Sequence, residues 1–116
     1  MKVTRFSECK KYSPPQHDIT IHSMHLQHRD MGCTAPYWVG CSYYLPGSRA
    51  EMSATPLEKV YVVLDGELTI EFEGGEIVKL GKMDSIFIDK DETREVRNET
   101  NAVATMLVAM PYPPAK

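Results

Sequence analysis

The sequence has few of the features that mark a secreted disulfide scaffold or a membrane protein. It contains only three cysteines, Cys9, Cys33 and Cys41. An odd number of cysteines without framework spacing favours free thiols in a reducing compartment. No apolar run approaches the roughly 18 residues that a membrane span needs. Residues 1–16 also lack the apolar segment of a secretory signal, so we expect a cytoplasmic protein.

An excess of charge of one sign is also missing. The net charge is −3, a quarter of the residues are charged, and no basic patch stands out. We therefore expect neither nucleic acid nor an anionic membrane among the partners. The hydrophobic fraction of 42% is typical of a globular protein. A chain of 116 residues suffices for one domain that buries roughly 65% of its unfolded surface.

Short strand-like segments make up most of the chain after a polar beginning. Residues 1–16 end in two prolines and are predicted to form an N-terminal arm, with residues 17–116 as the domain. No segment from 38 to 110 has a sustained helical period, which favours an all-β sandwich or barrel. Gly and Pro separate the expected strands, which cover residues 37–45, 59–64, 67–73, 75–80, 85–88, 94–98 and 102–110.

Two stretches resemble the conserved motifs of the cupin superfamily. Residues 46–70 are similar to the first motif, and Gly47 and Gly66 fall on its two glycines. Residues 80–100 are similar to the second motif, with Asp84 near its start and Asn98 at its end. The resemblance covers roughly residues 35–110. It implies a double-stranded β-helix, or jelly-roll barrel, with an internal pocket, and a homodimer in which an N-terminal strand packs across the partner.

The positions that bind metal in the family carry other residues here. Cupins hold a divalent metal with two histidines and a glutamate of the first motif and a histidine of the second. In this sequence the resemblance puts those positions at Ser53, Thr55, Lys59 and Arg94. None of these side chains is a usual ligand for a transition metal. The Pro-x-Gly of the second motif is replaced as well, by Asp89 and Asp91. We therefore expect no cofactor, with a divalent metal on substitute ligands as the alternative.

Strand alternation predicts where these side chains point. If Lys59 faces the inside of the barrel, Tyr61 does too. A buried cation needs an anion, so Lys59 and Arg94 are predicted to bind a small organic anion such as a carboxylate or phosphate. The predicted ligand-binding residues are Ser53, Thr55, Lys59, Tyr61 and Arg94.

Two alternatives assign the cations other roles. In one, Glu51 or Glu58 pairs with them and the side chains merely fill the barrel. In the other, the chain is an enzyme. A desolvated Lys59 could then act as a nucleophile or base, with Tyr61 as an acid.

Four histidines, His17, His22, His25 and His28, lie within twelve residues. On a regular strand, His22 and His28 share one face and His25 takes the other. They are interpreted either as an ordinary surface or dimer-interface segment, or as a divalent metal site formed by two of them, with or without Cys33. The candidate metal ligands are His22, His25, His28, Glu51 and Glu58.

The leading functional hypothesis is a cupin that binds a small molecule without the usual four metal ligands. One alternative is a metal-dependent cupin enzyme of the dioxygenase, isomerase or lyase type. Another is a non-catalytic sensor or accessory protein, since a fold does not by itself select a function.

Overall fold

A computed structural model describes residues 1–13 and 19–114 of the chain. Two 3₁₀ turns, η1 (Phe6–Glu8) and η2 (Arg29–Met31), accompany the strands. The strands are β1 (Lys11–Tyr12), β2 (Ile21–Gln27), β3 (Tyr37–Tyr44), β4 (Arg49–Ser53), β5 (Lys59–Asp65), β6 (Leu68–Phe72), β7 (Ile77–Leu80), β8 (Ser85–Ile88), β9 (Arg94–Arg97) and β10 (Ala104–Pro111). No helix of the described residues is long and apolar enough to cross a membrane.

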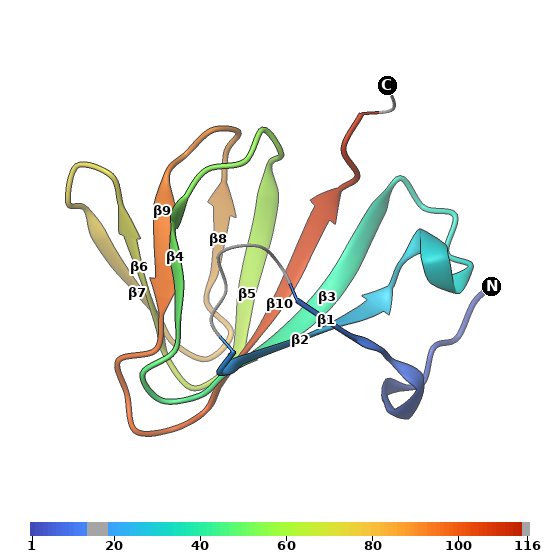
Figure 1. Cartoon of the computed structure of the whole chain (residues 1–116), viewed down its shortest axis with the longest axis horizontal. Coiled ribbons are helices and arrows are strands. Elements are labelled where there is room, and N and C mark those ends of the chain that lie inside the picture. The colour runs from blue at the N-terminus through green and yellow to red at the C-terminus, as the bar shows by residue number, and fades with distance from the viewer. Residues whose placement is uncertain (14–18, 115–116) are drawn as a thin grey trace.

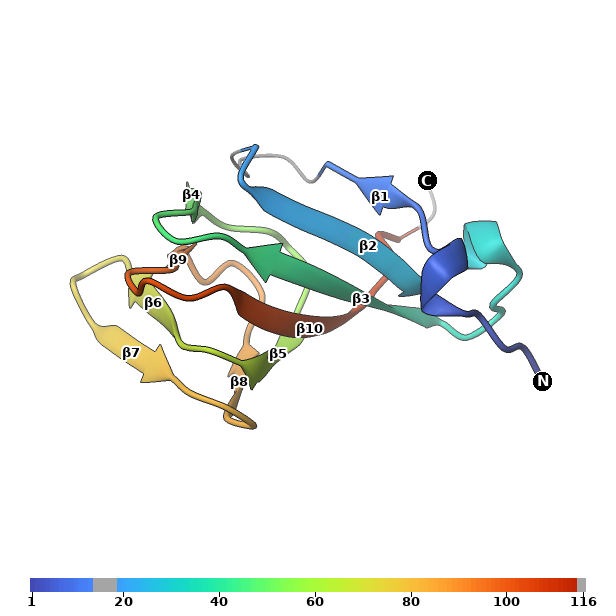
Figure 2. The ribbon, with the colours of Figure 1, turned by 90° about the horizontal axis from the view of Figure 1, so that it is seen from below.

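The strands form two antiparallel sheets that face each other, as Figures 1 and 2 show. One sheet has six strands in the order β1-β2-β3-β10-β5-β8, and the other has four in the order β4-β9-β6-β7. Strands that are neighbours in a sheet are often far apart in the sequence, and the last strand, β10, lies between β3 and β5. This arrangement confirms the predicted all-β jelly-roll barrel.

The core lies between the two sheets and follows from the alternation of side chains. Val63, Leu68, Ile70 and Ile88 are fully buried, and each comes from a strand that the sequence predicts. The outer face of the four-stranded sheet is charged instead. There Arg97 donates hydrogen bonds to Glu71 and Glu95, at 2.7 and 3.0 Å. Alternation thus separates an apolar interior from a charged exterior.

Three motif residues hold the turns at one end of the barrel. Gly66 has φ +79°, and a Cβ there would lie 2.8 Å from the Cα of Ala104, so only glycine fits. The buried Asn98 donates from Nδ2 to the carbonyl oxygens of Tyr44 and Ala102, each at 2.8 Å. The amide of Gly47 in turn donates to the carbonyl of Asn98 at 2.9 Å. These contacts give the motif residues a structural role that does not depend on a metal.

Part of the predicted arm joins the six-stranded sheet. In β1, Lys11 and Tyr12 pair with Met24 and Ser23 of β2, and the ring of Phe6 packs edge-on against Tyr43 at 6.3 Å. The predicted boundary at residue 16 lies outside the described residues and stays a prediction. The arm therefore contributes a residue, Tyr12, to the region between the sheets.

Candidate functional site

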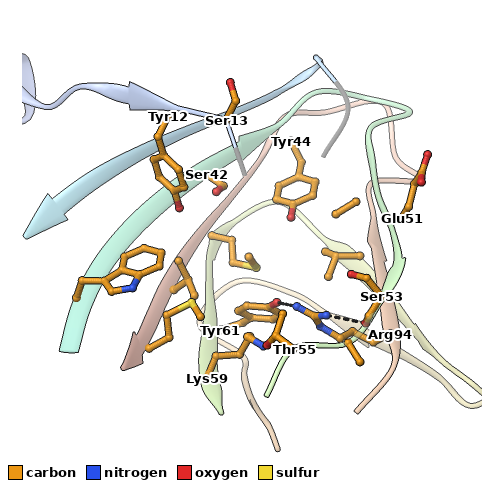
Figure 3. Close-up of a pocket in the computed structure, with 17 residues that line it drawn as sticks. Tyr12, Ser13, Ser42, Tyr44, Glu51, Ser53, Thr55, Lys59, Tyr61 and Arg94 are labelled. Atoms are coloured by element: carbon orange, nitrogen blue, oxygen red, sulfur yellow. Dashed lines mark hydrogen bonds between the residues drawn. The ribbon is translucent and has the colours of Figure 1, made fainter. Parts of the chain in front are cut away.

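A cavity of about 610 Å³ opens between the two sheets. All five residues predicted to bind a ligand lie on its wall, as Figure 3 shows: Ser53, Thr55, Lys59, Tyr61 and Arg94. They come from the end of β4 and the loop after it, from β5 and from β9. The structure thus brings the five residues together on one cavity, while their role in binding stays a prediction.

Lys59 is almost completely buried, with 4% of its surface exposed. Its Nζ donates to Oγ1 of Thr55 at 2.7 Å and to the carbonyl oxygen of Leu57 at 3.0 Å. Both partners are neutral, so neither compensates the charge of the ammonium group. Burial, and secondly the nearby Arg94, lower the pKa of Lys59 to about 8.

Arg94 reaches across the cavity from the opposite sheet. Its Nη1 donates to the carbonyl oxygen of Ser53, and its Nη2 donates to the hydroxyl of Tyr61, both at 2.8 Å. Ser53 thus meets Arg94 through its backbone carbonyl. Burial raises the pKa of Tyr61 despite the opposing effect of Arg94, which keeps the phenol protonated at neutral pH. The phenol oxygen accepts from Arg94, so its own proton is free for another acceptor.

No ion pair within 4.0 Å joins Lys59 or Arg94 to a carboxylate in residues 1–13 and 19–114. Glu51 and Glu58, the two acids considered as internal partners, are both exposed. Glu51 lies on the cavity wall, but its carboxylate points away from Lys59 and Arg94 in Figure 3. The alternative in which these acids neutralise the buried cations is therefore wrong for the described part of the chain.

The residues at the family's metal-binding positions do not fit a divalent metal. The hydroxyl of Thr55 already accepts a hydrogen bond from Lys59. Protonated lysine and arginine side chains are hydrogen-bond donors and have no lone pair with which to bind a metal, which applies to Lys59 and Arg94. A cation placed among them would also be repelled by their charge. Within the ranges that the structure describes, no three His, Cys, Asp or Glu side chains come close enough to hold a metal ion.

The opposite wall of the cavity is aromatic. Tyr12, Trp38 and Tyr44 line it together with apolar side chains of β10. Burial raises the pKa of Tyr12 to about 12, so this phenol is neutral as well. Sequence reasoning missed Tyr12, because a two-residue strand in a polar segment leaves no periodic pattern. The cavity therefore combines an aromatic side with a cationic end.

The histidine segment forms β2 and stacks its rings beside this wall. His25 lies between Tyr12 and His28, with ring centroids 3.9 and 4.0 Å apart. The register of β2 against β3 shifts between His25 and Gln27, which brings His28 to the same side as His25. The expected alternation of these two histidines is therefore wrong, and the bulge is the reason. His17 lies outside the described residues.

Trp38 meets both of these histidines, with its ring centroid 4.9 Å from His25 and 6.0 Å from His28. Nδ1 of His28 accepts a hydrogen bond from the amide of Asp30 at 3.1 Å. Burial, and secondly His28, lower the pKa of His25. The two imidazoles thus stack beside the aromatic wall, against Tyr12 and Trp38.

Comparison with known proteins agrees with the fold. Residues 42–110 match the family model described as the cupin domain. A protein of Mycobacterium tuberculosis named beta-D-galactosidase Rv1717 is 44% identical over 116 residues, which cover 100% of this chain and 98% of that protein.

Two solved structures illustrate the similarity in three dimensions. The polyketide cyclase RemF from Streptomyces resistomycificus has a TM-score of 0.84 at 18% identity, over 98% of this chain and 82% of its own. A predicted oxalate decarboxylase from Thermotoga maritima has a TM-score of 0.79 at 20% identity, over 97% of this chain and 100% of its own. At these identities the likeness extends to the fold and no further.

Proposed function

The chain belongs to the cupin family, and from this premise we propose that its barrel cavity binds a small organic molecule. The ligand places an anionic or hydroxyl-bearing group against Lys59 and Arg94. A single observation carries the proposal: two cationic side chains line one cavity and have no carboxylate partner among the described residues.

The energetic argument starts from the cost of burying charge. An ammonium group loses water when it is buried, and neutral hydrogen-bond acceptors replace only part of that solvation. A bound carboxylate or phosphate adds the missing Coulombic attraction, and a guanidinium group is suited to its planar or tetrahedral geometry. Sugar hydroxyls, which accept hydrogen bonds without carrying charge, replace a smaller part of the solvation.

The size and the walls of the cavity favour a ligand with an apolar or ring-shaped body. Small-molecule sites span roughly 300–1,000 Å³, and this cavity of about 610 Å³ falls within that range. The aromatic side chains Tyr12, Trp38 and Tyr44 supply flat surfaces on which a ring can pack. The polar group of the ligand then meets Lys59 and Arg94.

Thermal denaturation and calorimetry with benzoate, inorganic phosphate and methyl β-D-galactoside test this function. At a concentration about 100 times Kd, a ligand stabilises the folded protein by about 2.7 kcal/mol. We expect at least one probe to raise Tm, and Lys59→Met to lose most of that increase. The matched control is Lys82→Met, which removes an exposed lysine and leaves the increase unchanged. The proposal is contradicted if no probe raises Tm, or if Lys82→Met loses as much of the increase in Tm as Lys59→Met does.

A second candidate function is the hydrolysis of β-D-galactosides, which the 44% identical relative favours. Glycosidases usually place two carboxyl groups on either side of the scissile bond. In the described part of the chain Glu51 is the only carboxylate on the cavity wall. Lys59, with a pKa of about 8, is protonated at pH 7 and can serve as a proton donor to the departing oxygen.

A chromogenic β-D-galactoside, used with protein from a host that lacks its own β-galactosidase, tests this activity. We expect hydrolysis by the parent and by Lys82→Met, and a loss of at least about 100-fold in kcat for Lys59→Met if it supplies the proton. Glu51→Gln tests the carboxylate in the same way. Hydrolysis that is unchanged in both site variants would exclude the barrel cavity as the source of the activity.

A further inference from the structure

The surroundings of Lys59 resemble those of a reactive amine more than those of a lysine that only holds charge. A lysine paired with a carboxylate is kept protonated and unreactive. Lys59 instead has two neutral partners, the hydroxyl of Thr55 and the carbonyl of Leu57. Its third hydrogen position is used by no protein group among the described residues and leaves the amine open to the cavity.

We propose that the Nζ of Lys59 is a nucleophile that forms an imine with a small aldehyde or ketone that carries a carboxylate. The inference goes beyond reversible binding but rests on the proposed function for access to the same cavity. Arg94 selects for the carboxylate, and the neighbouring Lys59 reacts with the carbonyl carbon.

The protonation state of the amine supports this chemistry. With a pKa of about 8, about a fifth of Lys59 is unprotonated at pH 7.4. For an ordinary lysine the unprotonated fraction at that pH is about one in a thousand. Because the lower basicity makes each free amine somewhat less nucleophilic, we expect a net advantage of about tenfold in rate.

The cavity also holds groups that can move the protons of the reaction. The lone pair of Nζ forms a bond to the carbonyl carbon, and the carbonyl oxygen takes up a proton to give a carbinolamine. Loss of the nitrogen proton and of water then gives the imine, so one amine and one carbonyl yield one imine and one water. Thr55 Oγ1 lies 2.7 Å from Nζ and can relay the nitrogen proton, while the neutral phenol of Tyr61 can donate to the carbonyl oxygen.

Reductive trapping with glyoxylate and cyanoborohydride tests the proposal. Cyanoborohydride delivers a hydride to the imine carbon and leaves a stable carboxymethyl group on the nitrogen. We expect peptide mapping to show rapid modification of Lys59, counted apart from any modification of the exposed N-terminal amine. The exposed Lys82 in the same sample is the internal reference and should react about ten times more slowly. The comparison needs no variant, so it does not depend on whether Lys59→Met folds.

The pH profile separates a reactive site from simple accessibility. Modification of Lys59 should level off above about pH 8, whereas modification of a lysine with an ordinary pKa would continue to rise with pH. Equal rates for the two lysines, or no adduct on Lys59, overturn the inference.

The trapping result and the binding result can fail separately. If benzoate or phosphate stabilises the protein but glyoxylate leaves no adduct, binding stands and the reactive amine does not. If the adduct forms while every non-carbonyl probe fails to stabilise the protein, the amine is reactive and the proposed binding function is wrong.

Discussion

Replacing Lys59 by methionine should change the stability of the protein by an amount that depends on pH. The pKa of Lys59 is lowered from 10.5 to about 8, so the folded state disfavours its charged form. This lowering of the pKa corresponds to roughly 3 kcal/mol before screening, and water in the cavity reduces that figure. Methionine has a similar length and carries no charge, so the variant lacks this cost.

The sign of the effect follows from which state of the chain, folded or unfolded, binds the proton of Lys59 more tightly. Above pH 10.5 lysine is neutral in both states and costs nothing. As the pH falls from 10.5 to 8, the unfolded chain takes up the proton first, so the stability of the parent falls relative to the variant. Below pH 8 the difference stays constant. The hydrogen bonds to Thr55 and Leu57 lost in the variant offset about 1 kcal/mol each, at every pH.

Urea denaturation between pH 6.5 and 10.5 measures the predicted difference. We expect the free energy of unfolding of Lys59→Met minus that of the parent to be largest below pH 8 and to fall by up to about 3 kcal/mol toward pH 10.5. Other titrating groups are common to both proteins and cancel. Lys82→Met should show a flat difference. A flat difference for Lys59→Met as well would refute the reasoning, because it would mean that Lys59 is solvated or paired in the folded protein.

Three further predictions concern the structure around the cavity. The fluorescence of Trp38, the single tryptophan, should change as the pH falls below 6.5 and His25 takes up a proton, and the stability of the fold should fall over the same pH range. The variant His25→Phe should abolish this fluorescence change. A midpoint of the change at or above pH 6.5 would contradict the lowered pKa of His25. Gly40→Ala should lower the free energy of unfolding by about 1–3 kcal/mol, since the added Cβ would lie 2.8 Å from the Trp38 ring; a fully stable variant in a denaturant titration would argue against that packing. Asn98→Ala should cost about 2–4 kcal/mol, because it leaves the carbonyls of Tyr44 and Ala102 without donors, and an unchanged Tm would show that these turns are held by something else.

The fold was predictable where strands are apolar and their turns need special residues. Alternating side chains in β6 and β-branched residues in β5 predict the strands, and Gly66 occupies a turn that other residues cannot adopt. β4 was not predicted, since its one buried hydrophobic side chain is Ala50 and its register shifts before Ser53. An irregular polar strand has no period to detect.

The site was predictable to the extent that it follows the alternation of side chains along a strand, in which residues of the same parity (all odd-numbered or all even-numbered) share a face. Once Lys59 faces inward, Tyr61 must follow, and the cavity wall has both. Parity cannot show that Ser53 acts through its carbonyl, nor that Tyr12 joins the wall by pairing with β2. It also fails at His28, because one bulge reverses the face of every residue after it.

The substituted positions suggest how a barrel of this family can keep a positive cavity without a metal. A divalent ion supplies two positive charges that do not vary with pH. Lys59 and Arg94 supply the same two charges when both are protonated, and they bring hydrogen-bond donors with fixed directions. The difference is that the charge on Lys59 is lost near pH 8, whereas that on Arg94 remains. A metal site cannot release its charge in this way. Lysine and arginine at these positions therefore leave the cavity positively charged below about pH 8 and supply an amine that can accept or give up a proton near that pH.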